Sequence, residues 1–306
     1  MILLIQYTIV FATVLFLAAL GGCFSEHSGV MNIGIEGMMV AGALGGALTM
    51  KALSGAAPFV MVICTLLAAV LSGMVWSFLL SVPAVTHKAD QVLIGTAINM
   101  LSVAVATVVV KSVNLEVTGK AIPTLTYIDE KKALSFMAGS FRVDVFFLVA
   151  AVIAVLSVYI FRKTRFGLRL CACGENPEAA ASAGIHVRKM RYIGVLISGA
   201  LSGLAGVAYV TSSVSEWQFD KGVAGYGFLA MAVMIFGQWD PVKIALAALV
   251  FGFFRALSNV YMGIDFLNAL NIPGAVYNML PYIISLLILV IFSKKSHAPK
   301  AEGIPY

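Results

Sequence analysis

Long apolar segments, separated by short polar connections, make up most of the chain. A helix that crosses a bilayer needs about twenty mostly apolar residues. The segments that meet this requirement are 3–22, 33–50, 57–82, 91–112, 143–161, 193–213, 223–238, 242–262 and 276–293. We therefore expect an all-α polytopic membrane protein with about eight to ten transmembrane helices, folded as a single transmembrane domain over 1–306.

Composition supports the same class. Hydrophobic residues make up 61% of the chain, charged residues make up 11%, and the mean hydropathy is +0.99. A soluble domain carries about a quarter charged residues. The net charge of +6 comes from basic residues that cluster beside apolar segments. Such residues set membrane orientation, so we expect membrane lipid around the chain and no nucleic acid as a partner.

The segment 33–50 is the least regular of the apolar runs. It begins Ile33-Gly34-Ile35-Glu36-Gly37, with a carboxylate and two glycines where a lipid-facing helix would carry leucines. It is either a full span or a discontinuous or re-entrant one, which is tolerated only where protein or a water-filled cavity covers the backbone. The N-terminus is outside if this segment spans fully and inside if it is re-entrant.

The connection at 162–191 is the strongest marker of orientation. Short loops rich in Lys and Arg stay in the cytoplasm. The basic residues of this loop are Arg162, Lys163, Arg165, Arg169, Arg188, Lys189 and Arg191. Lys294 and Lys295 put the C-terminus on the same side. The connection at 113–142, with its mixed charges, is then external.

A short helix with both ends marked lies inside the cytoplasmic loop. Asn176 is a suitable N-cap, Pro177 suits the first helical position, and Glu178 favours the positive end of the helix dipole. Alanines propagate the helix, and Gly184 can take the left-handed conformation that ends it. A stiff, capped helix in this place is suited to docking a cytoplasmic partner.

Polar side chains at membrane depth are costly unless they face a cavity or a partner. Asn32 and Glu36 lie one helical turn apart and share a face. They could cap the helix and favour its dipole, or they could line a translocation path. Asn99, near the middle of its segment, could hydrogen-bond across helices or line the same path. We therefore treat Asn32, Glu36 and Asn99 as candidate residues of the translocation path.

Small residues recur at the spacing that lets helices approach closely in lipid. The patterns are Gly42-x-x-x-Gly46 and Gly199-x-x-x-Gly203. They predict either packing within the chain or a dimer interface.

Patterns typical of catalysis are absent from the sequence. It contains no G-x-x-x-x-G-K-[ST], no G-x-S-x-G and no H-E-x-x-H. The four cysteines form no C-x-x-C pair and no Cys/His cluster with metal spacing. We therefore expect no enzymatic activity, no metal and no cofactor in this chain.

Four blocks of sequence carry a resemblance to a known family. They are 28–39 (Ser-Gly-Val-Met-Asn-Ile-Gly-Ile-Glu-Gly-Met-Met), the Thr164–Ile185 region with Gly-Glu-Asn-Pro-Glu-Ala-Ala at 174–180, 225–241 (Gly-Tyr-Gly-Phe-Leu-Ala-Met-Ala-Val-Met-Ile-Phe-Gly-Gln-Trp-Asp-Pro) and 278–282 (Asn-Met-Leu-Pro-Tyr). Together they resemble the inner-membrane permease subunits of bacterial ABC importers of the branched-chain amino acid, simple sugar and nucleoside class.

The resemblance implies a mechanism and a set of partners. Such permeases lie in the bacterial inner (plasma) membrane and carry a cytoplasmic coupling helix that docks on a separate ATPase subunit, where ATP is hydrolysed. A second permease subunit, commonly an unlike paralogue, completes the pathway, and an external binding protein or lipoprotein delivers the small-molecule substrate. The residues assigned to coupling are Gly174, Glu175, Asn176, Pro177, Glu178, Ala179, Ala180 and Gly184.

The substrate is less constrained than the mechanism. Blocks 28–39 and 225–241 look most like the nucleoside branch, which takes guanosine or other purine nucleosides, while riboflavin, simple sugars and branched-chain amino acids remain open. An ion-coupled secondary transporter is a remoter alternative, which predicts intramembrane ionisable pairs. Glu36 and Arg255 are the candidates for such a pair, and the coupling helix would then have no role.

Overall fold

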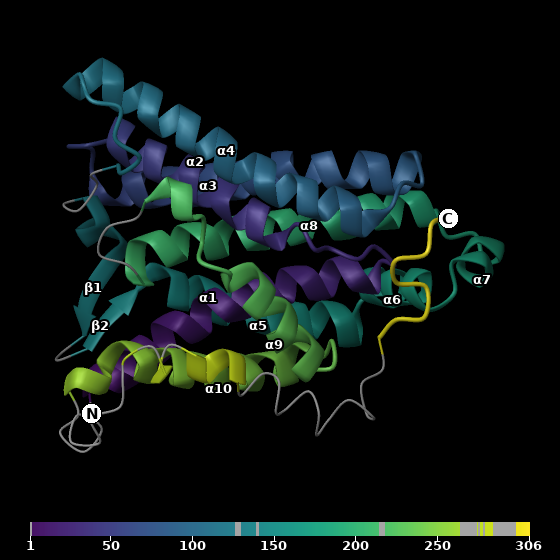
Figure 1. Cartoon of the computed structure of the whole chain (residues 1–306). Helices are drawn as coiled ribbons and strands as arrows, with labels where there is room; N and C mark the ends of the chain where they lie inside the picture. The colour runs from purple at the N-terminus through teal and green to yellow at the C-terminus, as the bar shows by residue number, and fades with distance from the viewer. Residues whose placement is uncertain are drawn as a thin grey trace.

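The computed structural model describes residues 2–125, 130–138, 141–213, 218–263, 274, 276–277, 279–283 and 298–306. Long helices run side by side as a bundle, with a small β-hairpin at one end and two short helices at the other (Figure 1). The helices are α1 (Ile2–His27), α2 (Ile35–Ala52), α3 (Pro58–Ser81), α4 (Gln91–Thr118), α5 (Val145–Lys163), α6 (Arg165–Glu175), α7 (Pro177–Ser182), α8 (Val187–Ala208), α9 (Tyr226–Phe236) and α10 (Pro241–Val260).

Six of these helices are long and apolar enough to cross a membrane, counted over the described ranges. They are α1, α3, α4, α5, α8 and α10. One-turn π-helical extensions lengthen α3 to Thr86 and α8 to Ser213. The prediction of a helical, multi-span membrane protein is confirmed. The predicted span at 276–293 is helical at 276–277 and 279–283, and its remainder lies outside the described residues.

The centre of the bundle is α8, which α1, α2 and α3 contact. Glycine makes these contacts close: a Cβ on Gly203 would lie 2.2 Å from the carbonyl oxygen of Ala69, and one on Gly42 would lie 2.2 Å from the Cα of Gly203. Both glycines belong to the predicted small-residue patterns. Their role as packing positions within the chain is therefore confirmed, because lipid offers helices little hydrophobic drive and close backbone approach compensates.

The irregular element is α9 rather than α2. The helix α2 is continuous over its 18 residues, so the discontinuous form considered for 33–50 is wrong. It is not one of the six candidate spans, so a re-entrant course for this segment stays a prediction. The helix in 223–238 has only 11 residues, a length of about 16 Å. The predicted full span there is wrong. Before α9, Gly222, Ala224 and Gly225 have positive φ angles of 57°, 53° and 78°, which break the chain before the helix begins.

The predicted external connection at 113–142 contains a two-stranded antiparallel hairpin of β1 (Ser135–Ala138) and β2 (Phe141–Asp144), paired from Ser135 with Asp144 to Ala138 with Phe141. Sequence analysis missed this element. A one-turn 3₁₀ helix, Glu130–Leu134, precedes the hairpin, and two more lie at Phe219–Lys221 and Tyr261–Gly263.

The predicted loop at 162–191 is mostly helical. The helix α7 occupies Pro177–Ser182 as expected, with the Asn176 Oδ1 accepting a hydrogen bond from the Ala179 N–H at 3.0 Å, and Gly184 has a φ of +79°. The preceding helix α6 was not predicted. It begins at an N-cap, Thr164, whose hydroxyl accepts from the Gly167 N–H at 3.2 Å.

Candidate functional site

Glu36 lies in the first turn of α2, yet its carboxylate caps a different helix. Oε1 accepts a hydrogen bond from the Gly225 N–H at 2.9 Å, and Oε2 accepts from the Gly227 N–H at 2.6 Å. The first N–H groups of a helix have no partner within it, and a negative charge there is favourable. The side chain is only 8% exposed. Glu36 therefore holds the start of α9 against the start of α2.

Glycine at 227 is required by this contact. A Cβ there would lie 2.5 Å from the Glu36 backbone nitrogen, closer than any side chain could approach. The backbone of α9 thus meets the backbone of α2 directly, and the carboxylate joins them from the side.

Asn99 ties α4 to the same place. Its Oδ1 accepts from the Gly37 N–H at 2.7 Å, and its Nδ2 donates to the Ile33 carbonyl at 2.9 Å. The Gly37 N–H lies in the opening turn of α2, where no intrahelical acceptor exists. Asn99 therefore caps α2 from a neighbouring helix, which agrees with the predicted hydrogen bond across helices.

Asn32 does not cap α2, so that interpretation is wrong. The N-cap position is Gly34, without a side-chain hydrogen bond. Asn32 is fully buried, and its Nδ2 donates to the Ser198 hydroxyl at 2.7 Å. Its Oδ1 has no hydrogen-bond partner among the described residues. Ser198 lies eleven residues into α8, near the middle of the continuous helical stretch Val187–Ser213.

The three candidates Asn32, Glu36 and Asn99 thus meet at one polar junction, where α2, α4, α8 and α9 come together. We call these three residues the α2 junction. Every one of them is less than a tenth exposed. The structure brings together residues that sequence reasoning placed in two separate segments, and it adds Ser198, Gly225 and Gly227, which that reasoning did not assign to the site.

An aromatic and basic cluster lies next to the junction. The Arg255 Nε donates to the Tyr226 hydroxyl at 2.7 Å, and its guanidinium carbon lies 5.3 Å from the centre of the same ring. The Tyr209 ring packs against Tyr226 with centroids 4.6 Å apart. Arg255 and Glu36 therefore do not pair with each other: the arginine binds a phenol, and the carboxylate binds backbone N–H groups.

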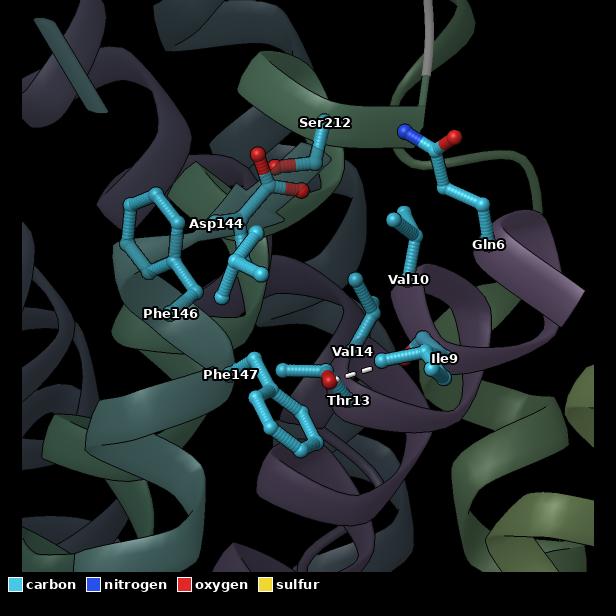
Figure 2. Close-up of a pocket in the computed structure, with 11 residues that line it drawn as sticks. Gln6, Ile9, Val10, Thr13, Val14, Asp144, Phe146, Phe147 and Ser212 are labelled. Carbon is cyan, nitrogen blue, oxygen red and sulfur yellow. Dashed lines mark hydrogen bonds between the residues drawn. The ribbon is translucent and has the colours of Figure 1, made fainter. Parts of the chain in front are cut away.

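A separate apolar cavity of about 150 Å³ lies between α1, the start of α5 and the end of α8 (Figure 2). Its lining includes Ile9, Val14 and Phe147, with Gln6 and Asp144 at the edge. The Thr13 hydroxyl donates to the Ile9 carbonyl at 2.8 Å, so it is already engaged within its own helix. No residue of the α2 junction lines this cavity, and its apolar wall is unsuited to a polar solute.

The predicted coupling residues lie at the end of the bundle that bears α6 and α7 (Figure 1). Glu175, Asn176, Glu178, Ala179 and Gly184 are exposed, and Pro177 is partly exposed. Gly174 and Ala180 are buried. Gly174 is the penultimate residue of α6, and a Cβ there would lie 2.5 Å from the His27 carbonyl oxygen. The set therefore comprises six exposed or partly exposed positions and two buried positions that pack against the bundle.

An ion pair links this end of the molecule to the loop between α9 and α10. The Arg162 Nη2 lies 3.0 Å from the Asp240 Oδ2. Partial burial of Asp240 would raise its pKa, but the hydrogen bond from Arg162 and the N–H groups of Lys243 and Val242 outweigh it, so the pKa of this carboxyl lies below its usual value. Asp240 also caps α10 through those two N–H groups.

Apolar spans around a central glycine-rich helix, with two short capped helices at one end, define a multi-span membrane transport subunit. Residues 4–292 match the family described as "Branched-chain amino acid transport system / permease component". The chain belongs to this permease family.

Relatives that are described as ABC transporter permeases support the same family. The chain is 38% identical over 313 residues to the guanosine ABC transporter permease protein NupQ of Bacillus subtilis, covering 99% of this chain and 96% of that one. It is 32% identical to the nucleoside ABC transporter permease protein NupC of Lactococcus lactis, covering 99% and 96%. It is also 27% identical to a second Bacillus subtilis guanosine permease, NupP, covering 90% and 77%.

A solved structure has a similar fold. A metal-chelate type ABC transporter in an inward-facing conformation superimposes with a TM-score of 0.52 and 15% sequence identity, covering 95% of this chain and 85% of that one. At this identity the likeness concerns the fold alone.

Proposed function

We propose that this chain is the permease subunit of an ATP-driven importer of nucleosides, with purine nucleosides such as guanosine as the leading substrates. The observation that carries the proposal is the near full-length similarity to two nucleoside permeases. ATP is hydrolysed on a separate ATPase subunit, and an external binding protein or lipoprotein supplies the substrate. The α6–α7 end and the C-terminus face the cytoplasm, in the inner membrane.

The coupling residues form the ATPase contact in this proposal. The helix α7 has only six residues, but both of its ends are fixed: Asn176 caps one, and the left-handed Gly184 follows the other. Within α7, Ala180 is buried, while Glu178 of the same helix and Glu175 just before it are exposed. A fixed element transmits a displacement that a flexible loop would absorb. The exposed face of α7 is therefore suited to follow the motion of an ATPase.

A second, unlike permease subunit completes the pathway in the proposal. The support is the pair of guanosine permeases in one organism, of which both resemble this chain and one is much nearer to it. The 1–306 chain acts as one transmembrane permease domain of that pair.

The α2 junction forms part of the wall of the translocation path in the proposal. It lies near half-depth in the bundle, and buried polar groups at such depth are costly unless they serve transport or assembly. The buried Asn32 Oδ1, which has no hydrogen-bond partner among the described residues, supports this assignment, because such a group is costly unless a solute or a partner pairs with it. The short helix α9 begins at this junction, which resembles the discontinuous helices that meet at the binding depth of many transporters.

Uptake of labelled guanosine by cells that express the chain with its partner subunits tests the substrate. Absence of guanosine uptake, together with uptake of labelled riboflavin, glucose or leucine by the same cells, would move the chain to another branch. Uptake that persists after ATP depletion and collapses with the ion gradient would instead support a secondary transporter.

Co-purification of the ATPase subunit tests the coupling face. Glu178→Arg reverses a charge on the exposed face of α7, and we expect it to abolish ATPase binding and uptake. The matched control is Glu116→Arg, an equally exposed position near the end of α4 that lies away from α7. Normal ATPase binding by the α7 variant, or equal losses in the two variants, would contradict this contact.

A further inference from the structure

Residues 298–306 fold back onto the end of the bundle that carries α6 and α7 (Figure 1). The Ala301 N–H donates to the Gly174 carbonyl at 2.8 Å. This bond attaches the segment to the end of α6, one residue before the exposed face of the coupling region begins. Ala301 is itself only 5% exposed. We call residues 298–306 the C-terminal strap.

The strap also holds the start of α8 through a buried cation. Arg191 is 1% exposed, and its Nη1 donates to the Ile304 carbonyl at 3.0 Å. Its guanidinium carbon lies 5.8 Å from the centre of the Tyr306 ring. A buried arginine is expensive unless it is paired or hydrogen-bonded. The strap supplies a carbonyl to Nη1 and an aromatic face, while Nε and Nη2 have no hydrogen-bond partner among the described residues. The strap therefore offsets part of the cost of burying this arginine.

A third set of contacts reaches α1 and the connection that leads to α2. A Cβ on Gly303 would lie 3.7 Å from the Met31 Cε, and one on Gly29 would lie 3.4 Å from the Ala301 carbonyl. The Glu302 carboxyl is partly buried, which raises its pKa, and it lies close enough to the Glu26 carboxyl for their negative charges to repel each other. Glu26 accepts a hydrogen bond from the Trp239 Nε1 at 2.5 Å. The strap therefore lies where α1, α6, α8 and the α9–α10 loop converge.

These contacts define a direct mechanical route. Gly174 touches both the strap and the His27 carbonyl at the end of α1. The connection from Ser28 to Gly34 then leads in a few residues to Asn32 and Glu36. Displacement of α6 and α7 would otherwise bend their short connections. The end of α6 contacts the strap, α1 and α8. These elements should therefore move together with α6, since packed interfaces shift as units.

We propose that the C-terminal strap is a coupling clamp, which binds the end of α6 to α1 and α8 so that movement of the ATPase contact reaches the α2 junction. The proposal rests on the proposed function and adds a residue-level link between its two sites. Arg191 and Ala301 act as positioning residues, because neither touches substrate or ATP. The clamp predicts that its loss separates ATP hydrolysis from transport.

The test uses the complete transporter in proteoliposomes, with the full set of partner subunits. One variant lacks residues 298–306. A second, Ala301→Pro, keeps the strap but removes the N–H that bonds to Gly174, because proline has no backbone N–H; it also fixes the φ angle of residue 301. Lys300→Ala is the control, since Lys300 is exposed and adjacent. ATPase co-purification, ATP hydrolysis and labelled nucleoside uptake are measured for each.

We expect both strap variants to keep the ATPase subunit and to hydrolyse ATP, while uptake per ATP hydrolysed falls at least fivefold, the lower end of ordinary coupling between sites. The control keeps the normal ratio. An unchanged ratio in both variants would overturn the clamp, even if less transporter assembles. Failure of the unmodified chain to bind any ATPase subunit would refute the proposed function, and the clamp with it. The wild-type measurement therefore distinguishes failure of the proposed function from failure of the clamp alone.

Discussion

At the scale of single residues, the carboxylate of Glu36 decides where α9 starts. It receives backbone N–H groups that lie 189 and 191 positions further along the chain. Sequence reasoning gave Glu36 two roles, favouring the dipole of its own helix or lining a path. The structure shows a dipole contact, but with another helix. A local pattern cannot specify this, since the acceptor and its donors approach each other only in the folded bundle.

Glu36→Gln should lower nucleoside uptake about tenfold, the equivalent of ~1.4 kcal/mol, while membrane levels stay near normal. The amide keeps one acceptor oxygen and turns an NH₂ group towards a backbone N–H, so one of the two α9 hydrogen bonds is lost. Uptake normalised to the amount of protein in the membrane is the measurement. The control is Glu116→Gln at an exposed site. Unchanged uptake at normal levels would remove Glu36 from the transport mechanism.

Asp240→Asn should destabilise the protein by ~0.5–1 kcal/mol at neutral pH, because the ion pair with Arg162 is partly exposed. Asparagine still caps α10, so the loss reports on the ion pair. The folded-state pKa of Asp240 is lowered, so its stabilisation is fully present above the unfolded pKa and is lost as the pH falls through the folded one.

Thermal unfolding in an acid-stable detergent measures this effect. The difference between wild type and Asp240→Asn should be constant from neutral pH down to about pH 5 and should shrink below about pH 4. A difference that grows on acidification would have the wrong sign and would exclude a depressed pKa at Asp240.

At the scale of elements, the glycine positions of α2 and α8 explain why these helices are central. Gly42, Gly203 and Gly206 let backbones touch: a Cβ on Gly206 would lie 1.9 Å from the Met39 carbonyl. The sequence pattern predicted such contacts and left open whether they were within the chain or between copies. Only the fold decides, because the same spacing serves both kinds of contact.

Gly203→Ala should be destabilising by ~1–3 kcal/mol, the usual range for added volume in a packed interior. The new methyl group would meet the Ala69 carbonyl, which belongs to helix backbone and cannot move aside cheaply. Gly263→Ala is the matched control, since among the described residues only the Val260 Cγ1, at 3.9 Å, lies near its Cβ position. Thermal unfolding in detergent compares the two variants. Equal stability in both would mean that α3 and α8 can separate at no cost.

At the scale of the whole molecule, early and late parts of the chain are interleaved. The first helix, α1, packs against α10, α8 and α9, which come from the second half of the chain. The buried core likewise includes residues from α1 through α10. An arrangement of this kind leaves no boundary at which one half could unfold alone, which favours the predicted single domain over 1–306.

The chain should therefore unfold in one cooperative transition in detergent. Tryptophan fluorescence, which includes buried Trp239, and far-ultraviolet circular dichroism should give the same midpoint. A fluorescence transition at a temperature well below that at which helicity is lost would reveal a separately unfolding part. It would contradict the single-domain prediction.

By itself the sequence determined the membrane class, six of the nine expected spans, the capped helix at 177–182 and the permease family, because these depend on composition and on signals that act within a few residues. Its errors lie at α9, at the hairpin and at α6. Asn32 and Glu36 were correctly singled out as unusual, since a polar group in an apolar run is visible without a structure. What they bind was not visible.

The tertiary structure alone decided that α2 is continuous and α9 short, that Glu36, Asn32 and Asn99 form one junction, and that residues 298–306 return to Gly174 and Arg191. The physical reason is the same in each case. Helix ends leave N–H and carbonyl groups unpaired, and inside a bilayer they must find partners within the protein. Those partners come from distant segments, so their identity depends on how the whole chain packs.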